Sequence, residues 1–122
     1  MTGYYIYKLI HLIGVLIVFL SIGGLILYAV GGAEREHPWR KRLFISHGTG
    51  IFLVLLGGFG LLAKIGILWP WPGWVAIKLT IWVILAALPG GIVRAPSLAK
   101  YLWWLTLLLG ASAIYLVLQK PF

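Results

Sequence analysis

The sequence predicts an all-α integral membrane protein that folds as an up-down bundle of four helices. The chain of 122 residues is 62% hydrophobic and only 10% charged, which is more apolar surface than one small soluble domain can bury. The apolar residues gather in four runs, each with the roughly 20 residues that a helix needs to cross the hydrocarbon of a bilayer. Only short connections separate the runs, so consecutive helices are expected to pack as antiparallel neighbours.

We expect one transmembrane domain that covers residues 1–122. The predicted helices span about residues 4–30, 43–66, 74–93 and 98–118. The first run is too long for the apolar part of a signal peptide and lacks the basic segment that precedes one, so it is assigned to the domain. Pro89, Gly90 and Gly91 are expected to bend the third helix or to end it early.

The charged residues are few and mostly basic. The chain has ten Lys and Arg residues but only two acids, Glu34 and Glu36, which gives a formal net charge of +8. The basic residues are split among short loops and helix ends, so we expect contact with lipid phosphates and no binding of nucleic acid. Cysteine is absent, which excludes disulfides, iron–sulfur clusters and thiolate chemistry.

The distribution of Lys and Arg predicts an orientation in the membrane. The first and third connections share one side, which carries Arg35, Arg40, Lys41, Arg42, Arg94 and Lys100. The opposite side carries Lys8, Lys64, Lys78 and Lys120. The more basic side is expected to face the cytoplasm. This predicts a multi-pass protein of the bacterial inner (cytoplasmic) membrane with both termini in the periplasm.

Ionisable residues inside the apolar runs are the candidate functional residues, because an unpaired charge in hydrocarbon costs several kcal/mol. Alignment of antiparallel helices at their ends places His11, Lys64 and Lys78 at one depth, about 5–10 Å below the surface on the side of the termini. Lys8 lies one turn nearer that surface. No acid lies in any run, so we expect an anion from lipid head groups or from the propionates of a tetrapyrrole. For the lysines, the alternative is that they extend to the interface.

Two stripes at heptad spacing are predicted to face the interior of the bundle. One stripe runs through His11, Gly14, Val18, Ser21, Leu25 and Tyr28, and the other through His47, Gly50, Val54, Gly57, Leu61 and Lys64. Small residues on facing stripes allow two outcomes. Either the helices pack closely, or they leave a slot for a flat ligand, in which case Gly14 is a cofactor-binding residue.

The three histidines predict different roles. His11 is too short to reach the interface, and an inward-facing neutral imidazole is a candidate axial ligand to haem iron. His47 is expected near Tyr28, and a structural hydrogen bond to Tyr28 or to water competes with cofactor binding. His11 and His47 are predicted to lie roughly 20 Å apart in depth, so one haem cannot take both as ligands. His37, in the polar loop, is expected to be solvated.

Two segments, KLIHLIGVLIVFLSIGGLILY and GWVAIKLTIW, together resemble the HemJ-type membrane protoporphyrinogen oxidases and the related CopD-like and SirB-like small four-helix membrane proteins. The matching positions are His11, Trp74 and Lys78. The resemblance implies a b-type haem at His11, a required Lys78 near it, and oxidation of protoporphyrinogen IX within the membrane. The sequence departs from the HemJ pattern at Ala29, where that family has a histidine after the tyrosine.

Together these features predict a small membrane protein that binds haem b and acts in tetrapyrrole or redox metabolism. The predicted catalytic residues are His11 and Lys78, and the predicted cofactor site comprises His11, Lys78, Lys64, Lys8, Gly14 and His47. If the protein is an enzyme, its partners are a tetrapyrrole substrate and a quinone. The alternative is a non-catalytic subunit of a larger membrane complex, and a homo-oligomer is left open. A copper or small-solute permease is disfavoured by one methionine and no cysteine.

Overall fold

The computed structural model describes residues 2–31, 37–67 and 70–119. These residues form four α-helices and one short 3-10 helix, with no strand among them. In chain order the elements are α1 (Thr2–Val30), α2 (Arg40–Lys64), α3 (Gly73–Arg94), the 3-10 helix η1 (Pro96–Leu98) and α4 (Ala99–Gln119). The prediction of an all-α bundle of four helices is confirmed.

The observed boundaries differ from the predicted ones mainly in α2. The start of α2 lies at Arg40, three residues earlier than predicted, and its end lies at Lys64. The chain leaves α2 through Gly66, whose φ of 80° is a conformation that glycine adopts without strain. Pro89 lies inside α3, which continues to Arg94, so of the two outcomes expected at Pro89, a bend or an early end, the early end does not occur.

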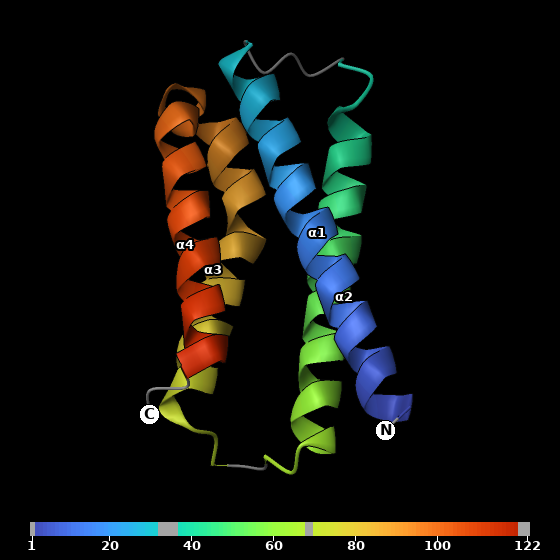
Figure 1. The fold of residues 1–122 in the computed structure, drawn as a ribbon. Coiled ribbons are helices and arrows are strands. Elements are labelled where there is room, and N and C mark those ends of the chain that lie inside the picture. The colour runs from blue at the N-terminus through green and yellow to red at the C-terminus, as the bar shows by residue number, and fades with distance from the viewer. Residues whose placement is uncertain (1, 32–36, 68–69, 120–122) are drawn as a thin grey trace.

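Consecutive helices run antiparallel, with α1 and α3 in one direction and α2 and α4 in the other (Figure 1). The start of α1, the end of α2, the start of α3 and the end of α4 lie at one end of the bundle, which we call the terminal end. The turn through η1, the end of α1 and the start of α2 lie at the opposite end, which we call the η1 end. The predicted up-down order of helices is therefore the observed one.

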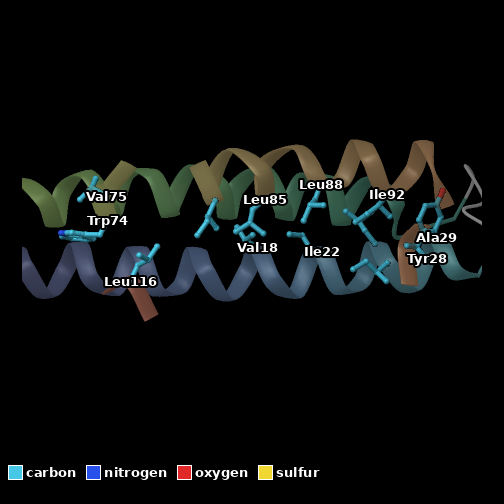
Figure 2. Close-up of a cluster of buried hydrophobic side chains, with 14 residues drawn as sticks. Val18, Ile22, Tyr28, Ala29, Trp74, Val75, Leu85, Leu88, Ile92 and Leu116 are labelled. Carbon is cyan, nitrogen blue, oxygen red and sulfur yellow. The ribbon is translucent and has the colours of Figure 1, made fainter. Parts of the chain in front are cut away.

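The core is a row of buried side chains that runs along the bundle between α1 and α3, with contributions from α4 (Figure 2). Its most buried members are at most 1% exposed: Val18, Ile22, Leu25, Ile92 and Ala99. Trp74 and Leu116 lie toward one end of this row, and Tyr28 toward the other (Figure 2). The core therefore joins α1, which is paired with α2, to the α3–α4 half of the bundle.

The outer surface of the bundle is largely apolar. Leu20, Trp104 and Leu118 are each about 70% exposed, at 74%, 69% and 73%. In the most apolar 18-residue window of each helix, at most 33% of the residues are buried. The four helical segments, of 22 to 28 residues, are each long and apolar enough to cross a membrane. Their outward-facing side chains match hydrocarbon better than water.

Candidate functional site

Close approach of α1 and α2 is made possible by glycines on the stripes that were predicted to face inward. A β-carbon on Gly14 would lie 2.7 Å from the nitrogen of Val54 and 2.9 Å from the oxygen of Gly50. A β-carbon on Gly57 would lie 2.5 Å from the nitrogen of His11. The backbone of one helix thus occupies the space where a side chain of the other would stand. Of the two outcomes expected at Gly14, the structure has close packing.

The imidazole of His11 is oriented by a backbone carbonyl within this contact. Its Nδ1 lies 2.9 Å from the oxygen of Val54. Because a carbonyl oxygen can only accept a hydrogen bond, Nδ1 carries the proton and donates it. In the neutral ring the lone pair is then on Nε2, which is the atom left to bind a metal ion. Metal-binding histidines are held in the same way, by a hydrogen bond from the nitrogen that does not bind the metal.

Lys78 approaches this ring from α3. Trp82 of α3 contacts Ile51 of α2, and Lys78 lies one helical turn before Trp82, so Lys78 is at nearly the same depth as His11, which stands opposite Gly57. Lys78 is partly buried and follows Trp74, which is 8% exposed, by one helical turn. The structure therefore combines an imidazole from α1 with an ammonium group from α3.

Lys64 does not share the depth of His11, and the prediction that it does is wrong. Gly57 stands opposite His11, whereas the Cε of Lys64 lies 2.6 Å from where a β-carbon on Gly3 would be. The seven residues from Gly57 to Lys64 place the lysine about 10 Å nearer the terminal end. The prediction assumed a later start of α2, which begins at Arg40, and this offset changed the alignment of the two helices.

Lys8 and His37 both lie outside the core, and each rests against a tyrosine. The Nζ of Lys8 is 5.6 Å from the centroid of the Tyr4 ring, which suits a cation at a membrane interface. The ring of His37 lies edge-on to Tyr28, with the centroids 5.5 Å apart, and its Nδ1 accepts a hydrogen bond of 3.1 Å from the nitrogen of Trp39. His37 is exposed, as expected, but it also holds the chain ahead of α2.

The side chain of His47 completes the hydrogen bonding of α3. His47 is 5% exposed, and its Nε2 donates to the oxygen of Leu85 at 3.0 Å. Pro89 stands four residues after Leu85 and has no N–H, so the helix itself supplies no donor to this carbonyl. A structural hydrogen bond, one of the two roles expected for His47, is present, but its partner is Leu85 and not the expected Tyr28. The sequence signal was Pro89, because a carbonyl that proline frees in an apolar helix needs a donor from elsewhere.

The separation of His11 and His47 is smaller than predicted but leads to the same conclusion. His47 precedes Gly57, the residue opposite His11, by ten residues. This places the two histidines about 15 Å apart along the bundle. One haem therefore cannot use both as axial ligands.

Two further polar contacts connect the helices, and of their side chains only Ser21 belongs to a stripe that was predicted to face inward. Ser21 on α1 donates to Ser46 on α2 at 2.8 Å. Trp82 on α3 donates from Nε1 to the oxygen of Ile51 on α2 at 3.1 Å. Like His47, these side chains connect α2 to its neighbours. For Ser46 and Trp82 the only advance signal was a polar group inside an apolar run.

Comparison with known proteins gives no relative from which a function could be carried over. No protein-family model matches the chain, and no curated protein or solved structure gives a significant match. The fold defines the structural class of the protein: its described residues form an all-α bundle of four helices, each long and apolar enough to cross a membrane.

Proposed function

We propose that this protein spans the bacterial inner membrane four times and binds a b-type haem through His11, in tetrapyrrole or redox metabolism. Four apolar helices and an outer surface of exposed leucine and tryptophan support the membrane placement. Five described basic residues gather at the η1 end: Arg40, Lys41, Arg42, Arg94 and Lys100. The excess of basic residues at the η1 end over the terminal end supports a cytoplasmic η1 end and periplasmic termini.

The observation that carries the haem proposal is the hydrogen bond from His11 to Val54. It holds the ring in one orientation and leaves Nε2 as the nitrogen that can bind a metal ion. Among the described residues, no three His, Cys, Asp or Glu side chains gather into a possible metal site. A metal at His11 would therefore take most of its coordination from a macrocycle, as the iron of a haem does.

Lys78 is the second residue of the proposed site. It lies at nearly the same depth as His11, and an ammonium group can pair with the propionate of a porphyrin through charge-assisted hydrogen bonds. A bound haem would supply one-electron redox chemistry. In this proposal His11 binds the metal and Lys78 positions the macrocycle or a tetrapyrrole substrate. Gly14 and Lys64 are left out, because both pack against the neighbouring helix.

An absorption spectrum of the detergent-purified protein, with and without dithionite, tests the proposal. We expect a Soret band in protein from haem-replete cells and its loss in His11→Ala. His37→Ala is the matched control, because His37 is exposed at the other end of the bundle, and it should keep the band. A colourless wild-type protein, or full haem content in His11→Ala, would contradict the proposal.

A non-catalytic subunit of a larger membrane complex is the second candidate, and the surface of α4 favours it. In the most apolar window of this helical segment only 11% of the residues are buried. Its exposed aromatic side chains include Tyr101, Trp104 and Tyr115, at 62%, 69% and 58%. Such a face suits lipid or another transmembrane helix. Native gel electrophoresis after mild extraction separates the cases: a stable larger assembly favours the subunit, and a solitary chain or homo-oligomer counts against it.

A further inference from the structure

A hollow of about 430 Å³ lies at the η1 end, between the end of α1 and the turn that joins α3 to α4. Ala29, Val30 and Pro96 form the apolar part of its wall, and Ser97 and Lys100 provide a hydroxyl and an ammonium group. Ser97 and Lys100 are both exposed. The hollow therefore combines an apolar wall with two hydrogen-bond donors.

The surroundings of this hollow are strongly basic. At the same end of the bundle, Arg94 closes α3 and the first turn of α2 contains Arg40, Lys41 and Arg42 but no acid. No Asp or Glu occurs among the described residues. The Nζ of Lys100 lies 5.1 Å from the centroid of the Tyr101 ring. This arrangement suits a cation at a membrane–water interface. An anion at this end is attracted by the described basic residues of α2, α3 and α4.

We propose that this hollow binds the head group of an anionic phospholipid. Lys100 and Ser97 donate hydrogen bonds to the phosphate, and Ala29, Val30 and Pro96 contact the glycerol and the first carbons of the acyl chains. The apolar wall favours a lipid over free phosphate, because inorganic phosphate has nothing to place against it. The basic residues around the hollow, Arg94 and the first turn of α2, favour an anionic lipid over a zwitterionic one.

The inference rests on the proposed membrane placement and does not depend on haem. If the protein does not span a membrane, it will appear in the soluble fraction of lysed cells without detergent. That result is distinct from a failure of the lipid site. A purified protein without haem would not contradict the proposed lipid site. Lipid selectivity is therefore measured on protein that has first been recovered from membranes.

The test measures thermal unfolding of the detergent-purified protein while phosphatidylglycerol, phosphatidylcholine or inorganic phosphate is titrated in. We expect phosphatidylglycerol to raise the unfolding temperature more than the other two. Lys100→Gln should weaken the apparent affinity for phosphatidylglycerol about fivefold, the effect of one basic residue at an anionic surface. Ser97→Ala should weaken it less and serves as the second variant if Lys100→Gln folds poorly.

Lys41→Gln is the matched control, because it removes the same charge from an exposed position at the same end without altering the wall of the hollow. It should keep nearly the wild-type affinity. Equal losses in Lys41→Gln and Lys100→Gln would assign the effect to diffuse surface charge and overturn the inference. Equal stabilisation by phosphatidylcholine or by inorganic phosphate would overturn it as well.

Discussion

The imidazole of His47 on α2 donates a hydrogen bond across the bundle to the carbonyl of Leu85 on α3, with its Nε2 3.0 Å from the oxygen. The carbonyl needs this donor because Pro89, one turn later, has no N–H. A neighbouring helix thus supplies the hydrogen bond that the proline removes, which allows α3 to continue to Arg94.

His47→Ala should destabilise the bundle by about 1–3 kcal/mol, because the carbonyl of Leu85 then lies buried without its side-chain donor. Pro89→Ala restores a backbone N–H to the same carbonyl. In the Pro89→Ala background the cost of His47→Ala should therefore be smaller. Unfolding in mixed detergent micelles measures all four proteins of this cycle. An identical cost in both backgrounds would show that His47 does not compensate for the proline.

Gly57→Ala should separate α1 from α2, because the added β-carbon would lie 2.5 Å from the nitrogen of His11. The expected loss of stability is about 1–3 kcal/mol, as for overpacking of a core. Gly48→Ala on the same helix is the control, since a β-carbon there meets nothing within 4 Å. It should be neutral or stabilising by up to about 1 kcal/mol. Equal thermal stability of the two variants would refute the close contact.

Lys78→Gln and Lys64→Gln should differ in haem retention if the proposed site is correct. Lys78 lies near His11, whereas Lys64 packs on Gly3 toward the terminal end. Loss of a charge-assisted hydrogen bond to a propionate should weaken haem binding about tenfold in Lys78→Gln. Lys64→Gln should bind as the wild type does. Haem titration of the apoproteins, followed at the Soret band, measures both, and equal losses would remove Lys78 from the site.

The orientation of the bundle in the membrane can be determined by labelling single introduced cysteines, because the chain has no cysteine of its own. Tyr5→Cys places a thiol at the terminal end, where the tyrosine is 60% exposed, and Ser97→Cys places one at the η1 end. The positive-inside rule predicts that a membrane-impermeant maleimide reaches only Tyr5→Cys from the periplasm. After permeabilisation both should react. The reverse pattern in intact cells would place the termini in the cytoplasm.

The sequence was sufficient to predict that His11 and Lys78 lie at a similar depth. It was not sufficient to exclude Lys64 from the proposed site. His11 and Lys78 stand in apolar segments where polar residues are rare, and a matched depth could be inferred from helix lengths. The position of Lys64 depends on how far α2 slides along α1. A shift of a few residues moves a side chain by several ångströms, because each residue adds about 1.5 Å along a helix.

The sequence by itself determined that the chain forms four long apolar helices, because each run is long enough to cross hydrocarbon and the connections are short. Contacts between those helices were decided only by the tertiary structure. The backbone of Gly57 stands opposite His11, and His47 reaches the carbonyl that Pro89 leaves free. Composition and periodicity describe each helix alone, whereas these contacts depend on the shift and rotation of one helix against another, which side-chain packing selects.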